Sequence, residues 1–109
     1  MKVLFNNCYG GFAFSKAFIA FMEAHPEIKD GKYTRTDPEF IKMVEDFGLE
    51  QASSNFSAMA IALVPDEATD WWVDEYDGYE SVYYVLDGKR HAAKTIDSCP
   101  FIRGYHYEI

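Results

Sequence analysis

Two Asp-Gly dipeptides constrain the fold of this chain more than any other feature. Asp77-Gly78 and Asp87-Gly88 separate three runs that have the composition of strands, namely Asp70–Tyr76, Glu80–Leu86 and Lys89–Ala93. Asp-Gly between such runs favours two-residue hairpin turns, because both turn positions then adopt positive φ. The second half of the chain is therefore predicted to be an antiparallel sheet.

The first half of the chain predicts one strand and two helices. Lys2–Asn6 has the composition of a strand, and Ser15 is a candidate N-cap for a helix with apolar residues at helical spacing that Pro26 would bound. The second helix begins at Thr36-Asp37-Pro38-Glu39, where Thr36 would form a capping box and proline occupies the first turn, and Gly48 would end it. Its predicted buried stripe consists of Phe40, Ile41, Val44 and Phe47.

The segment Ser57–Val64 is predicted to be a central strand. Met59, Ile61 and Leu63 are predicted to be buried and alternate with alanines, and such an alanine face permits close approach by a helix or another chain. Leu49–Ser54 is either a helical extension or a loop, Asp30-Gly31 is a predicted turn, and the aromatic tail from Pro100 is predicted to pack on the body. The fold class is α+β, with two helices packed on one face of a mostly antiparallel sheet, in a single domain spanning residues 1–109.

The charge of the chain is negative and unevenly distributed. The formal net charge is −8, and no lysine or arginine lies between Lys42 and Lys89. This balance argues against binding of long nucleic acid, although a local basic region could still hold a small anion. The longest apolar run is too short to cross a bilayer and the N-terminus has no signal-peptide pattern, so no membrane association is expected.

The loop between the first strand and the first helix is the main candidate ligand site. Its paired glycines would let backbone N–H groups approach a phosphate, and a neighbouring aromatic ring could stack on an attached base. The alternative is a tight turn that needs glycine for positive φ. The candidate ligand-binding residues of this loop are Asn7, Tyr9, Gly10, Gly11, Phe12 and Ser15.

Two further segments are candidate parts of the same site. Arg35 precedes the second helix and could clamp a phosphate, or it could pair with Asp37 or Glu39. Tyr76 and Asp77 lie in an acidic hairpin that could read a base edge or chelate a divalent cation. The commoner role of such a hairpin tip is Asp-Gly turn chemistry alone.

Catalysis and metal binding find no support in the sequence. The histidines are scattered without metal-ligand spacing, and Cys8 has no assignable base. Cys8 and Cys99 are expected to be reduced rather than joined in a disulfide. Of the aromatic pairs Trp71/Trp72 and Tyr83/Tyr84, at least one member of each should be core and the other is available for an interface or for stacking, but alternation does not say which is which. A non-enzymatic protein without metal or cofactor is expected.

Several of these motifs together resemble a family of small proteins from tailed phages and giant viruses. The resemblance covers most of residues 1–80 and excludes the segment 89–109. It rests on Asn7-Cys8-Tyr9-Gly10-Gly11-Phe12 with Ser15, Arg35-Thr36-Asp37-Pro38, Val64-Pro65-Asp66 and Glu75-Tyr76-Asp77-Gly78-Tyr79-Glu80.

The viral setting that the resemblance implies suggests what such a protein would do. It would sequester a small anionic ligand, a cyclic nucleotide immune signal, in the host cytoplasm as a homo-oligomer, in the way of known signal sponges. An acidic inhibitor that contacts a host protein directly, and an accessory domain without a small ligand, are the alternatives.

Overall fold

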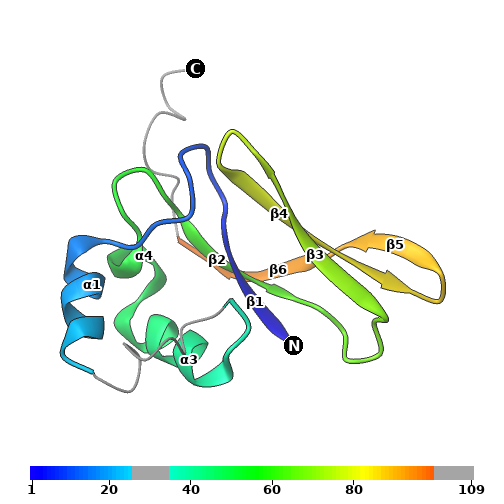
Figure 1. Cartoon of the computed structure of the whole chain (residues 1–109), viewed down its shortest axis with the longest axis horizontal. Helices are drawn as coiled ribbons and strands as arrows, with labels where there is room; N and C mark the ends of the chain where they lie inside the picture. The colour runs from blue at the N-terminus through cyan, green and yellow to red at the C-terminus, as the bar shows by residue number, and fades with distance from the viewer. Residues whose placement is uncertain (26–34, 100–109) are drawn as a thin grey trace.

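The strands divide into two antiparallel sheets in the computed structural model, which describes residues 1–25 and 35–99 (Figure 1). Each sheet has three strands, in the orders β1-β2-β6 and β3-β4-β5. The strands are β1 (Lys2–Asn6), β2 (Met59–Leu63), β3 (Asp70–Tyr76), β4 (Tyr79–Leu86), β5 (Lys89–Ala92) and β6 (Lys94–Ser98). With the helices, this is the predicted α+β class.

The two sheets are joined where β5 continues into β6. Only Ala93 separates these strands, and its N–H donates to the Val82 carbonyl of β4 at 2.8 Å. The chain then leaves β4 and pairs with β2 instead. A single sheet was the expectation, and β6 was not predicted. The difference arises because one continuous stretch of chain pairs with a different neighbour on each side of Ala93.

The helices of the described residues all lie on one side of the first sheet (Figure 1). They are α1 (Lys16–Glu23), α3 (Pro38–Phe47) and α4 (Leu49–Ala52). Ser15 caps α1 as predicted, and Gly48 ends α3 with a φ of 101°. The predicted Thr36 cap is wrong, because the Asp37 carboxylate accepts the Glu39 N–H and Pro38 is the first helical residue. No helix in these parts of the chain is long and apolar enough to cross a membrane.

The core between the helices and the first sheet matches most of the predicted burial. The buried side chains there include Phe18, Phe40, Ile41, Val44, Met59 and Ile61. Phe21 and Phe47 are half-buried. Leu63 is 43% exposed, so its predicted burial is wrong. Its pairing with the first residues of β1 and β6 places it at the end of the sheet, beyond the last core residue of that face.

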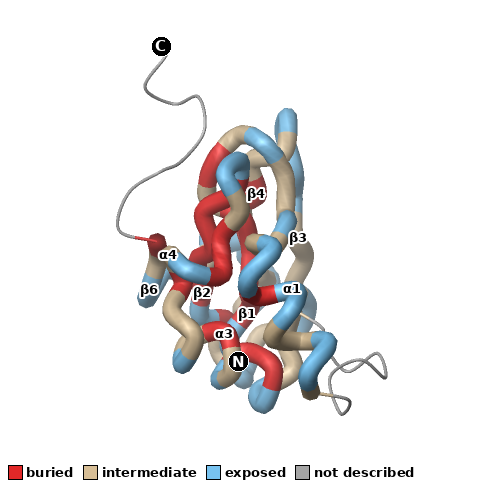
Figure 2. Tube along the Cα trace, turned by 90° about the vertical axis from the view of Figure 1, so that its left-hand side faces the viewer, coloured by how far each residue is buried: buried red, intermediate tan, exposed pale blue. Residues whose placement is uncertain are grey.

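The alanine face of β2 is covered by the second sheet. Ala60 and Ala62 form a buried cluster with Val3, Phe5 and Val82. Figure 2 shows buried residues, in red, along β1, β2 and β4. Small side chains let the two sheets approach closely, which is the role that the sequence had suggested for a helix or another chain. β2 is therefore buried on both faces.

The turn predicted at Asp30-Gly31, the boundary at Pro26 and the tail from Pro100 lie outside the described residues.

Candidate functional site

The loop that follows β1 packs directly on the tip of the β3–β4 hairpin. The Gly10 N–H donates to the Asp77 carbonyl at 3.3 Å. A Cβ added at Gly78 would lie 2.5 Å from the Gly11 nitrogen, and one added at Gly10 would lie 2.0 Å from the Phe56 carbonyl oxygen. The two segments that the sequence singled out separately are thus one structural unit, in which glycine is required for close approach.

The Asn6 side chain stabilises this unit by hydrogen bonds to both segments. Its side-chain amide donates to the carbonyls of Cys8 and Gly78 at 2.7 and 2.8 Å, and its amide oxygen accepts the Ala58 N–H. Asn6 is fully buried at the end of β1. This role of Asn6 was not predicted from the sequence, although a polar residue at the end of an apolar strand is a signal that its side chain caps the following turn.

Arg35 is near the loop, and its charge is already compensated. Its guanidinium forms a bidentate pair with Glu80 at 2.9 and 2.8 Å, and also donates to the Leu4 carbonyl. The Phe12 ring lies 3.9 Å from the guanidinium carbon. Among the described residues the carboxylate that Arg35 pairs with is Glu80, rather than Asp37 or Glu39. A phosphate would have to compete with a buried partner.

Glu80 is the residue that the sequence analysis missed at this point. It is 6% exposed, and it accepts the Asn6 N–H at 2.8 Å in addition to the two bonds from Arg35. Strand alternation could have identified it, because Glu80 shares its face of β4 with the core residue Val82. A carboxylate at a buried position requires a cationic or hydrogen-bonding partner.

The Ser15 side chain and the Asn7 backbone, two further parts of the predicted cradle, are also hydrogen-bonded within the chain. The Ser15 hydroxyl accepts the Phe18 N–H and lies 2.7 Å from the Gln51 carbonyl oxygen, to which it donates. The Asn7 backbone N–H donates to the Ala58 carbonyl at 2.8 Å. Asn7 also lines a cavity of about 200 Å³ together with Phe5 and Glu80, which is below the usual range of ligand pockets. A larger cavity of about 530 Å³ between β1 and α3 is lined by none of the predicted ligand-binding residues.

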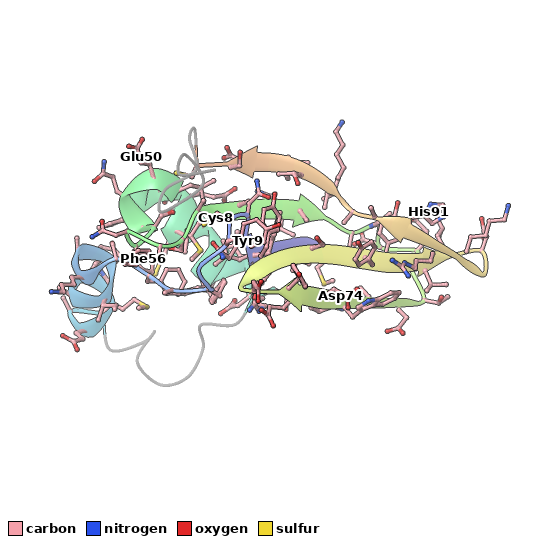
Figure 3. All side chains as sticks on the ribbon, turned by 90° about the horizontal axis from the view of Figure 1, so that it is seen from above. Cys8, Tyr9, Glu50, Phe56, Asp74 and His91 are labelled. Atoms are coloured by element: carbon pink, nitrogen blue, oxygen red, sulfur yellow. The ribbon has the colours of Figure 1, made fainter. Side chains whose placement is uncertain are left out.

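Three tyrosines gather at the hairpin end of the second sheet. The Tyr9 ring lies edge-on to Tyr79 at 5.0 Å and to Tyr76 at 6.5 Å between ring centroids. Figure 3 shows Tyr9 beside the hairpin, with Asp74 farther along β3 and away from the helices. Tyr76 is 71% exposed. Asp77 has a φ of 51° and forms the turn with Gly78, as its turn role requires.

The aromatic row continues along the outward face of the second sheet. Trp72 stacks on Tyr83 with 5.9 Å between centroids, and the Arg90 guanidinium lies 4.4 Å from the Tyr83 ring centroid. Trp71 and Tyr84 point the other way and pack against the buried cluster around Val82. We refer to the outward row as the aromatic face. Its residues are Tyr9, Trp72, Tyr76, Tyr79 and Tyr83.

Exposed carboxylates border the aromatic face. Along β3 and its flanks they are Asp66, Glu67, Asp70, Asp74, Glu75 and Asp77. Asp66 pairs with the N-terminal ammonium group at 3.3 Å, and Glu75 accepts the Gly78 N–H within the hairpin. The groups of His, Cys, Asp and Glu in residues 1–25 and 35–99 include none that could hold a metal ion.

The two cysteines are buried and are not joined in a disulfide. Cys8 and Cys99 pack in one cluster with Ala58. Burial raises the pKa of the Cys8 thiol above its ordinary value, against an opposing hydrogen bond to Asn6. A buried thiol with a raised pKa carries little thiolate at neutral pH, so it is a poor nucleophile.

Comparison of the chain with protein-family models, curated proteins and solved structures finds no match. The resemblance to a family of tailed phages and giant viruses therefore stays a prediction.

Proposed function

We propose that this protein binds another protein directly, and that the aromatic face with its acidic border is the contact surface. The observation that carries the proposal is the outward aromatic row next to Asp70 and Asp74, in which Trp72 is half-buried and Tyr76 is 71% exposed, with no basic residue on β3 or the hairpin tip. The partner has a basic surface, as the excess of carboxylates requires. This is the direct-contact alternative to a ligand-sequestering protein.

Large aromatic side chains are the residues that most often dominate binding energy at protein interfaces. Tyrosine and tryptophan bury much area at a small entropic cost, and truncation at a central position costs about 2 kcal/mol or more. Trp72 is held by its stack on Tyr83, which reduces the entropy it loses on binding. The carboxylates around it would raise the association rate with a basic partner and make binding sensitive to salt.

Sequestration of a nucleotide is supported less well. Arg35 would have to release Glu80, and the Glu80 carboxylate would then be left buried with one donor fewer. Such unpaired burial is costly. The predicted cyclic-nucleotide ligand, the host cytoplasm and the homo-oligomer stay predictions.

The test compares capture of partner proteins by the full chain and by two variants. The double variant Trp72→Ala/Tyr76→Ala removes two aromatic side chains of the aromatic face, and Ile19→Ala removes an exposed apolar side chain of α1 as a matched control. We expect the same proteins to be captured by the original chain and by Ile19→Ala, and to be lost with the double variant and at high salt. Thermal unfolding of all three checks that the folds are intact.

Two outcomes would overturn the proposal. One is capture that is equally strong with the double variant. The other is release of a nucleotide, seen as absorbance at 260 nm after denaturation, whose binding depends on Arg35 and is unaffected by Trp72→Ala. The second outcome would restore the ligand-sequestering alternative.

A further inference from the structure

β3 is an edge strand with backbone groups that face outward. It pairs with β4 alone among the described strands, over the seven residues Asp70–Tyr76. The two-residue turn at Asp77-Gly78 makes Tyr76 and Tyr79 a hydrogen-bonded pair. Because such pairs alternate along an antiparallel ladder, the N–H and C=O groups of Val73 and Glu75 point away from β4.

The charge of β3 decides which kind of strand could pair with that edge. An antiparallel pairing of two copies through β3, centred on Val73, would place Asp74 of one chain diagonally across from Asp70 and Asp74 of the other. Like charges opposite one another destabilise a sheet, and charged edges are a common protection against such self-pairing. A strand that carries lysine or arginine would gain from the same carboxylates.

We propose that an extended basic segment of the partner adds to β3 as a fourth strand of the second sheet. This proposal rests on the proposed function and specifies how the partner is held. The backbone of the segment bonds to the outward groups of Val73 and Glu75, which is the strand-addition mode of peptide recognition.

Strand alternation fixes which side chains of the segment matter. Side chains on the outward face of the added strand lie beside Trp72, Asp74 and Tyr76, which share that face. Lysine or arginine at every second position would meet the Asp74 carboxylate and the faces of the aromatic rings. The intervening side chains lie on the inward face beside Trp71 and Val73, where small apolar residues fit.

One local feature limits where pairing begins. The Trp71 N–H is already held by the Asp70 carboxylate at 2.8 Å. Among the described residues, no side chain accepts the N–H of Val73 or Glu75 in this way, so pairing starts there, at the hairpin end. The partner strand needs to cover only the half of β3 next to the turn.

The experiment uses the full chain and a synthetic peptide of seven alternating lysine and valine residues with blocked ends. Amide hydrogen exchange is followed by NMR with and without the peptide. We expect exchange at Val73 and Glu75 to slow at least ten-fold. The amide of Arg90 is the matched control, since β5 is the other edge of the sheet, and its exchange should not change. A peptide with glutamate in place of lysine should not bind.

The outcomes separate this inference from the proposed function. If the peptide shifts the Trp72 and Tyr76 signals but leaves exchange at Val73 and Glu75 unchanged, the aromatic face binds and strand addition is wrong. If the lysine peptide does not bind at low salt, or protects Arg90 equally, strand addition is wrong as well. In both cases the capture experiment with Trp72→Ala/Tyr76→Ala still decides the proposed function by itself.

Discussion

At the scale of single residues, Glu80 has the largest consequence for the predicted site. Its carboxylate accepts hydrogen bonds from the Asn6 N–H and from both terminal nitrogens of Arg35. Glu80 therefore links β4 to β1 and to the segment that precedes α3. Arg35, the predicted phosphate clamp, instead forms an ion pair within the chain. Its side chain is 31% exposed, so part of the pair is screened by water.

Glu80→Ala should therefore destabilise the fold. Loss of the carboxylate leaves a buried N–H and a partly buried guanidinium without their acceptor, which costs about 1.5–3 kcal/mol. Urea unfolding measures the change in unfolding free energy. Glu80→Gln keeps an acceptor for Asn6 and should lose less. Equal stability of Glu80→Ala and the original chain would show that the pair contributes nothing.

The Cys8 thiol gives a prediction for pH. Its pKa is raised in the folded state by burial, so the folded chain keeps this proton at a pH where the unfolded chain loses it. The contribution to stability is complete below the unfolded pKa of about 8.5 and is lost as pH rises through the folded value. Unfolding free energy should fall above that pH, and Cys8→Ser should fall less steeply. The native thiol should react slowly with iodoacetamide at neutral pH and rapidly in urea.

At the scale of elements, the hairpin tip depends on glycine at one position and on turn chemistry at the other. Gly78 has a φ of 86°, and its α-carbon faces the backbone of Gly10 and Gly11. Asp77 also has positive φ but lies at the exposed side of the turn. The same turn therefore tolerates one substitution and not the other.

Gly78→Ala should destabilise the chain by more than the strain of a positive φ alone, which is on the order of 1–2 kcal/mol, because the added methyl group would clash with backbone 2.5 Å away. Asp77→Asn should change stability little, since asparagine suits such turns equally well. Thermal unfolding of the two variants measures the difference. A mild Gly78→Ala would mean that the loop can move away from the hairpin.

At the scale of the whole molecule, the helices, the first sheet and the second sheet form three layers, because β2 is buried on both faces. The helices cover the face with Met59 and Ile61, and the second sheet covers the face with Ala60 and Ala62. The aromatic face is left outward because Trp71, Val73 and Tyr84, on the other side of the second sheet, pack toward this core. The proposed contact surface thus depends on how the layers stack.

Ala62→Leu should separate the layers. The position is 1% exposed, and a larger side chain there overfills the space between the sheets at a cost of about 1–3 kcal/mol. Leu63→Ala, at the neighbouring exposed position, should change stability less. Urea unfolding of the two variants tests this order, and the reverse order would contradict the layer arrangement.

The sequence by itself determined the local elements. Asp-Gly turns, the glycine after α3, the serine cap of α1 and the alternation of β2 are set by backbone conformation and by residues a few positions apart. These signals are complete within a short segment, so they could be interpreted without the fold. The positions of β3, β4 and β5 were predicted to within one residue at each end for the same reason.

Only the tertiary structure decided what the candidate site residues do. Arg35 pairs with Glu80 rather than with its sequence neighbours because the fold brings β4 against β1. The two residues of this ion pair are far apart in the sequence. Trp71 packs against the buried cluster and Trp72 lies on the outward face because the second sheet presents one particular face to β2. Alternation puts neighbouring residues on opposite faces, but it carries no information about which face another layer will cover.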